Sequence, residues 1–261
     1  MEKYKTILIE DTDNIVCVWL NRPEVHNAMN ALMIEELTSA YSSFKNDQIK
    51  AIVLRGKGKS FCAGADLHYM KDIASFGLKE NTRDSLKLAK LFQCIYSSPI
   101  PTIALVHGSA FGGANGLLAA CDMVLAEENT TFAFNEVKLG IAPATIAPFV
   151  IKRIGEFGAK ELMITGKKFK TKEALKWQLV NHSFTNVELE DALQKILHEI
   201  KRNGPQAVQE TKKLIHLIMN EEDNDMLKHT AKLIAKLRAS DEGQEGMESF
   251  LEKRKPKWVK D

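Results

Sequence analysis

Residues 106–126 read VHGSAFGGANGLLAACDMVLA, and this stretch decides the fold. An apolar run that predicts a buried strand is followed by four glycines between positions 108 and 116, and then by small residues typical of a closely packed helix. The first turn of a helix has free backbone N–H groups and the positive end of the helix dipole. We therefore expect main-chain N–H groups here to face an oxygen that becomes negative; the alternative is that the glycines only allow close packing.

A second glycine-bearing loop, SFCAGAD at 60–66, follows the apolar run AIVLRG at 51–56. Loops that follow strands lie at the carboxyl edge of an α/β sheet, where ligands tend to bind. The segment GKGKS is not a phosphate loop, because Val53 stands where the first glycine is required. HGSAFGG is not a nucleophile elbow, because His107 stands two residues before Ser109. GSAFGG also fails the dinucleotide pattern, which leaves two loops suited to a paired anion site.

The chain has 261 residues, of which 44% are apolar and 27% charged, as is ordinary for a globular protein. Strands alternate with helices up to about residue 146, and from Ala147 onward the pattern is almost entirely helical. This order predicts an α/β layer followed by a helical extension. Helices are predicted at 31–44, 82–96, 147–155, 158–165, 172–179, 188–202, 205–219 and 223–252.

Composition and charge argue against several classes of protein. The net charge of +2 is too small to predict nucleic-acid binding, although the tail EKRKPKWVK at 252–260 is basic. No stretch approaches the roughly 18 consecutive apolar residues of a membrane span, and the start MEKYKTILIE has no secretory signal. We expect a cytoplasmic protein that binds neither nucleic acid nor membrane.

No metal site is expected. The four cysteines lack C-x-x-C spacing, which predicts free thiols in a reducing compartment. The histidines near the two loops have no ligand spacing either. These residues are Cys17, Cys62, Cys94, Cys121, His26, His68 and His107.

Five segments together resemble the enoyl-CoA hydratase/isomerase (crotonase) superfamily in order and spacing, over essentially the whole chain. They are NRPEVHNAMN (21–30), SFCAGADLHYM (60–70), HGSAFGGANGLLAACDMVLA (107–126), FNEVKLGIAP (134–143) and FLEKRKPKW (250–258). The resemblance implies an α/β crotonase fold, with a spiral of ββα units at 1–195 and a C-terminal helical trimerisation region at 196–261. It also implies a homotrimer or a dimer of trimers that acts on acyl-CoA thioesters. No permanently bound cofactor is expected, since coenzyme A is part of the substrate.

The resemblance also implies the site residues. The backbone N–H groups of Ala65 and Gly113 would form an oxyanion hole for the thioester oxygen, and Glu136 would be the general acid/base. The family's other glutamate position, three residues after the donor glycine, is Gly116 in this chain. Residues expected to contact CoA or the acyl group are Val25, His26, Ala63, Ala65, Asp66, Leu67, Gly112, Gly113, Phe250 and Lys253, the last two reaching it from the C-terminal helix, in some relatives that of a neighbouring subunit.

The expected reaction is addition of water across the α,β double bond of an enoyl-CoA. The alternative is a Δ3,Δ2-enoyl-CoA isomerase that uses the single glutamate; a noncatalytic CoA-binding or RNA-binding relative is a third hypothesis. Gly116 and the segment APATIAPFV at 142–150 resemble the branch that handles methylglutaconyl-CoA. The missing side chain at Gly116 predicts room for a larger acyl group.

Overall fold

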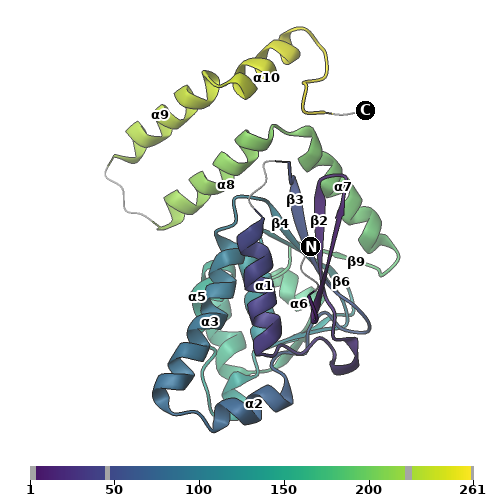
Figure 1. The fold of residues 1–261 in the computed structure, drawn as a ribbon, viewed down its shortest axis with the longest axis vertical. Coiled ribbons are helices and arrows are strands. Elements are labelled where there is room, and N and C mark those ends of the chain that lie inside the picture. Colours follow the sequence, from purple (N-terminus) through teal and green to yellow (C-terminus); the bar gives the residue numbers. More distant parts are fainter. Residues whose placement is uncertain (1–3, 45–47, 221–224, 260–261) are drawn as a thin grey trace.

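A computed structural model describes residues 4–44, 48–220 and 225–259. Its centre is a six-stranded sheet in the order β1-β2-β3-β4-β6-β9, in which β1 and β2 form an antiparallel hairpin and all other neighbours are parallel (Figure 1). The strands are β1 (Ile7–Thr12), β2 (Ile15–Leu20), β3 (Ala51–Gly56), β4 (Thr102–Val106), β6 (Met123–Glu127) and β9 (His182–Phe184). The hairpin turns at Asp13 and Asn14, which both have positive φ, as two-residue hairpin turns require.

A smaller sheet positions the glycine-rich stretch. It has the order β5-β7-β8, with β5 (Ser109–Phe111) parallel to β7 (Thr131–Ala133), and β7 antiparallel to β8 (Lys168–Lys170). Because β5 leads directly into α4 (Gly113–Ala120), its pairing with β7 brings the start of α4 beside the residues that follow Ala133.

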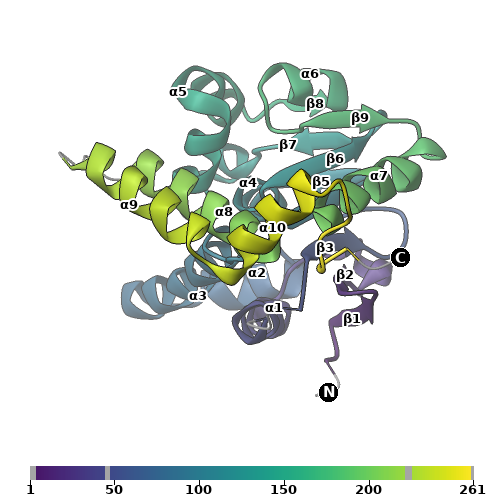
Figure 2. The same ribbon diagram turned by 90° about the horizontal axis from the view of Figure 1, so that it is seen from above.

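Helices cover both faces of the large sheet (Figure 2). On one face, α1 (Ala31–Ser43) and α3 (Leu78–Tyr96) pack together in the main core, which receives Ile52 and Leu54 of β3. On the other face, α7 (Glu188–Arg202) packs against Val53 through leucines at 189, 193 and 197. The alternation along β3 is that of a strand buried on both faces. The predicted boundary at residue 195 lies within α7, whose leucines pack against the sheet.

The C-terminal helices extend away from the core as an arm (Figure 1). They are α8 (Pro205–Asn220), α9 (Met226–Arg238) and α10 (Asp241–Leu251). Buried Lys212 of α8 joins the arm to the core, because its Nζ lies 2.7 Å from Asp122 Oδ2. The single helix predicted at 223–252 is wrong: Ser240 caps α10 by accepting a hydrogen bond from the Gly243 N–H, and residues 223 and 224 lie outside the described chain.

The remaining elements are α2 (Leu67–Ala74), α5 (Ala147–Thr165), α6 (Thr171–Lys176) and the 3₁₀ turns η1 (Pro23–Val25) and η2 (Glu136–Leu139). The two helices predicted within 147–165 form α5, which is interrupted at Gly155 by a φ of 73°. Within the described ranges, no helix combines the length and apolar character needed to cross a membrane.

Candidate active site

The two glycine-bearing loops lie side by side. Residues 61–62 form hydrogen bonds with the segment that contains β5: the Phe61 N–H donates to His107 O at 2.9 Å, and the Cys62 N–H donates to Ser109 O at 3.0 Å. In the reverse direction the Phe111 N–H donates to Cys62 O at 3.2 Å. Cys62 and Ala110 form a parallel bridge, so the first loop continues the small sheet as an extra short strand.

In each loop a glycine of positive φ precedes the predicted oxyanion donor. Gly64, at φ 99°, accepts a 2.7 Å hydrogen bond from the Met29 N–H, and Gly112, at φ 52°, accepts a 2.9 Å bond from the N–H of the third residue of α4. In a trans peptide the C=O and the following N–H point in opposite directions. The N–H groups of Ala65 and Gly113 therefore point away from these bonds, and neither donates to any residue in the described part of the chain.

The backbone of the first loop passes close to that of β5 at Gly64, and the Met29 side chain lies close to Gly113. A Cβ atom on Gly64 would lie 3.0 Å from Phe111 O, and one on Gly113 would lie 2.7 Å from Met29 Cε. Met29 also forms a parallel bridge with Ala65. The Ala65 N–H and the Gly113 N–H thus belong to adjacent segments that both contact Met29.

Glu136 lies against the same loop. It starts η2 just after β7, and its Oε1 is 3.3 Å from the point that a Cβ on Gly112 would occupy. Its Oε2 is buried and accepts no hydrogen bond from any described residue. Burial raises the pKa of Glu136, and the hydrogen bond from its own backbone N–H opposes this only in part. A carboxyl group with a raised pKa and a free oxygen is suited to accept and return a proton near neutral pH.

The room predicted beside Gly116 is not present. Gly116 is buried in α4, and a Cβ there would lie 2.5 Å from Ile146 Cγ2 and 2.6 Å from Phe92 Cζ. Both side chains belong to the main core. Apolar side chains therefore fill the space into which a second carboxylate would project, and an acyl group does not enter from that side.

A family model described as enoyl-CoA hydratase/isomerase matches residues 10–261. This chain belongs to that family. It is 34% identical over 253 residues to a mevalonyl-coenzyme A hydratase of Aspergillus fumigatus, covering 95% of this chain and 92% of that protein. It is 31% identical over 266 residues to a mitochondrial Δ(3,5)-Δ(2,4)-dienoyl-CoA isomerase of Dictyostelium discoideum, covering 97% and 91%.

A crystal structure of an enoyl-CoA hydratase from Shewanella pealeana superposes with a TM-score of 0.94 at 35% identity. The match covers 98% of this chain and 97% of the other. The predicted α/β crotonase fold with a helical C-terminal region is therefore confirmed. Enoyl-CoA hydratase/isomerase chemistry follows from the family, and an acyl-CoA substrate is consistent with it.

Asp66 holds the loop at 60–66 of this family member in place. Its Oδ1 accepts hydrogen bonds from the N–H groups of His68 and Tyr69 and so caps α2, while its Oδ2 lies 2.8 Å from Arg22 Nη2. Burial alone would raise the pKa of Asp66, but the bonds from Arg22 and the two backbone N–H groups outweigh it and lower the pKa. Both oxygens of the Asp66 carboxylate, which was predicted to contact CoA, therefore already have hydrogen-bond partners within the chain. Sequence reasoning missed Arg22, which the NRP segment contains.

Other predicted CoA contacts of the hydratase/isomerase lie near this loop. The Ala63 N–H donates to His26 O at 2.9 Å, which joins the segment after η1 to the loop. His26 Nδ1 lies 3.2 Å from Ser60 Oγ. Val25 and Leu67 have exposed side chains, as expected of residues available to a ligand.

Phe250 and Lys253 do not lie near the other predicted CoA contacts of the same chain. Phe250 is 83% exposed at the end of α10, and Lys253 follows that helix. Figure 1 shows α10 at the opposite end of the molecule from α2. The two residues therefore stay candidates only for the site of a neighbouring chain.

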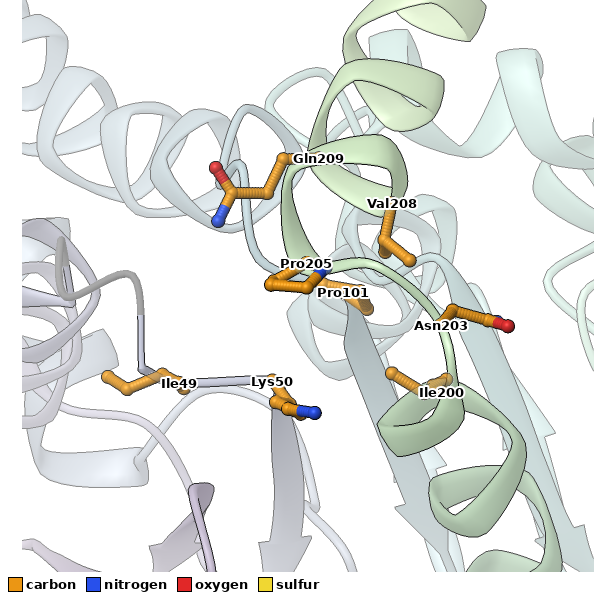
Figure 3. Close-up of a pocket in the computed structure, with 8 residues that line it drawn as sticks. All are labelled: Ile49, Lys50, Pro101, Ile200, Asn203, Pro205, Val208 and Gln209. Atoms are coloured by element: carbon orange, nitrogen blue, oxygen red, sulfur yellow. The ribbon is translucent and has the colours of Figure 1, made fainter. Parts of the chain in front are cut away.

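The hollows found among the described residues include two that lie apart from Glu136. The one in Figure 3, between the starts of β3 and β4 and the α7–α8 connection, has a volume of about 10 Å³, which is room for about one water. Another, of about 360 Å³, lies at the carboxyl edge of the large sheet on the α7 face. None of the predicted site residues lines either hollow. Among the described residues, no group of three His, Cys, Asp or Glu side chains is placed to bind a metal ion.

Proposed function

We propose that this protein is an enoyl-CoA hydratase. The observation that carries the proposal is the combination of two backbone N–H groups without partners in the described chain, on Ala65 and Gly113, with the buried free oxygen of Glu136. Two such donors suit an oxygen that gains charge during reaction, and the carboxyl group beside them suits proton transfer.

The proposed reaction follows from these groups. The N–H groups of Ala65 and Gly113 bind the thioester oxygen, and Glu136 takes a proton from water as the water oxygen bonds to C3. The C2=C3 electrons move onto the thioester oxygen as an enolate, which the two donors stabilise. Glu136 then returns the proton to C2, so that one carboxyl group completes the addition. In other enzymes, loss of one oxyanion donor costs about 3 kcal/mol of transition-state stabilisation.

A second candidate is a Δ3,Δ2-enoyl-CoA isomerase. The observation that favours it is the apolar wall of Phe92 and Ile146 at Gly116, where a second carboxylate would otherwise help to hold water. In this reaction Glu136 removes a proton from C2 and delivers it to C4. One relative is named as an isomerase and another as a hydratase, so the family supports both.

The test is Glu136→Gln, with exposed Glu128→Gln as the matched control. Each purified variant is given a 2-enoyl-CoA and a 3-enoyl-CoA, and the products are identified after reaction in D₂O. A hydratase yields the 3-hydroxyacyl-CoA from the 2-enoyl substrate, whereas an isomerase yields the conjugated enoyl-CoA from the 3-enoyl substrate. Near-normal turnover by Glu136→Gln would refute the role of this carboxyl group in either reaction.

We propose a branched or carboxylated acyl group such as methylglutaconyl. The support is the resemblance of Gly116 and of residues 142–150 to the methylglutaconyl-CoA branch. The space expected beside Gly116 does not support it, because apolar side chains fill that space. Rates on methylglutaconyl-CoA and crotonyl-CoA decide the point. A crotonyl-CoA rate that equals or exceeds the other would contradict it.

We propose a homotrimer or a dimer of trimers. The support is the C-terminal arm: α9 buries none of its described residues, and Leu227, Phe250 and Leu251 are more than three-quarters exposed. Exposed apolar side chains on an arm that buries few of its own residues are available to pack against another chain. Light scattering measures the assembly, and a monomer would contradict the proposal. Lys253→Ala is expected to raise the KM for acyl-CoA if this residue reaches a neighbouring site.

A further inference from the structure

Asn115, the third residue of α4, is completely buried beside the proposed site. Its Nδ2 donates to Ala133 O at 2.8 Å, and the same carbonyl accepts the Gly112 N–H at 2.9 Å. Because a carbonyl oxygen only accepts, the NH₂ side of the amide must face Ala133. Its Oδ1 is buried and accepts nothing from any described residue.

If Asn115 only filled space in the core, its unpaired Oδ1 would destabilise the folded state. A buried acceptor left without a partner costs about 1–3 kcal/mol, whereas an apolar side chain of similar shape would carry no such cost. Within the described chain, the hydrogen bond from Nδ2 to Ala133 O is the one contact by which the amide of this side chain is held.

That bond connects the start of α4, which carries the Gly113 N–H, to the end of β7, which leads to Glu136. The N–H of Gly113 is at the start of α4, and Ala133 ends β7, three residues before Glu136. Ala133 O is the point at which the start of α4 is attached to the chain that carries the carboxyl group. We propose that Asn115 is a positioning residue: through Ala133 it fixes Glu136 relative to the Gly113 N–H, and so sets the proton-transfer geometry of the enoyl-CoA reaction proposed above.

The Glu136 carboxyl group lies so close to Gly112 that a small displacement changes its position relative to this loop. Glu136 Oε1 lies only 3.3 Å from where a Cβ on Gly112 would be, so a small shift of β7 moves the carboxyl group along this loop. Misplacement of a catalytic group by about 1 Å costs on the order of 100-fold in rate.

The first test is Asn115→Leu, which keeps the approximate shape and removes both the Nδ2 donor and the unpaired Oδ1. We expect kcat to fall about 10- to 100-fold with a smaller change in the KM for acyl-CoA, since most residues expected to contact CoA lie on other segments. The melting temperature should stay the same or rise. The control is Asn181→Leu, because Asn181 Oδ1 accepts bonds from the Val124 N–H and Arg153 away from the site. That variant should lose stability and keep its kcat.

The second test is the titration of Glu136, followed by NMR of labelled glutamate carboxyl groups. In Asn115→Leu the pKa of Glu136 should fall toward that of an ordinary glutamate, because a released carboxyl group gains water; in Asn181→Leu it should not change. If the wild-type protein turns over no enoyl-CoA, the proposed function is refuted. The titration of Glu136 would still show whether Asn115 positions its carboxyl group. An unchanged kcat and titration, or a kcat loss that only follows a loss of stability, would overturn the inference.

Asn115→Asp gives a third readout. A neutral carboxylic acid can donate to Ala133 O, but a carboxylate cannot, so kcat relative to wild type should decline as the new carboxyl group ionises. A constant ratio of the two kcat values across the pH range would count against the hydrogen bond as the cause.

Discussion

Glu136→Gln is expected to make the folded protein more stable at neutral pH while it removes most of the activity. The pKa of Glu136 is raised by burial, so the folded state binds this proton more tightly than the unfolded state does. Stability then falls as the pH rises from the ordinary glutamate pKa, about 4.3, through the raised value. The glutamine cannot ionise and escapes this loss.

Loss of a general acid/base lowers kcat about 10²- to 10⁴-fold. This corresponds to about 2.7 to 5.4 kcal/mol of transition-state stabilisation. The gain in folding stability should be about 1.4 kcal/mol for each unit by which the measured pKa of Glu136 exceeds its unfolded value. The gain should be absent below about pH 4 and constant above the raised pKa.

The control is Glu36, a carboxylate that is also buried but is fully hydrogen-bonded. It accepts bonds from the N–H groups of Lys5 and Thr6, each at 2.8 Å. Burial opposes ionisation there, but these bonds outweigh it and lower the pKa of Glu36. Glu36→Gln should therefore lose stability at neutral pH without loss of kcat.

The assay is chemical denaturation of wild type and both variants at several pH values, with kcat measured on the same preparations. A stability difference between wild type and Glu136→Gln that does not vary with pH would refute the argument from burial. A difference of the opposite sign at neutral pH would show that Glu136 has a partner in the folded chain.

Three further outcomes are expected. Gly116→Ala should cost about 1–3 kcal/mol of folding stability, because its Cβ would lie 2.5 Å from Ile146 Cγ2 in a filled core; denaturation midpoints measure this loss. Gly112→Ala should add about 1–3 kcal/mol of backbone strain at φ 52° and press on Glu136, so both Tm and kcat should fall. Asp66→Asn should cost about 2 kcal/mol at neutral pH by breaking the pair with Arg22. Wild type should lose this advantage as the pH falls through the lowered pKa of Asp66, which acid titration of both proteins measures.

Helices with apolar residues at helical spacing were predictable from the sequence, and these include α9, which buries none of its described residues but lies within the range predicted at 223–252. The helix predicted at 31–44 is α1, which Asn30 caps and which buries six residues. No helix was predicted at 67–74, although its apolar residues follow helical spacing and Asp66 caps α2; the helix is short and buries none of its residues. The break between α9 and α10 was missed because the apolar spacing continues through it; Ser240 marks the break, where its Oγ accepts a hydrogen bond from the Gly243 N–H.

Site residues were predictable only where a motif or the family resemblance identified them. Glu136, taken alone, is an acidic residue in a polar loop, and only the pairing of β5 with β7 brings it to the glycine loop. The roles of Arg22 and Asn115 depend on distant partners: Asn115 bonds a carbonyl 18 residues away. Composition and spacing do not encode such pairs, so they had to come from the structure.

What distinguishes the site physically is the gathering of polar groups that the fold leaves unpaired. Folded chains pair nearly all buried polar groups, because each unpaired one costs free energy. Among the described side chains, unpaired buried atoms of Tyr41 and Trp177 occur singly, packed among aromatic neighbours. By contrast, the free N–H of Gly113 and the carboxyl group of Glu136, whose Oε2 has no described partner and whose Oε1 lies nearer, both adjoin Gly112. The same chain pairs the buried carboxylate of Glu36 fully, yet within its described part it leaves a hydrogen-bond donor, the Gly113 N–H, and an acceptor, Glu136 Oε2, without partners at one loop. The proposed reaction requires this arrangement, because the donor can bind a substrate carbonyl and the acceptor can transfer a proton.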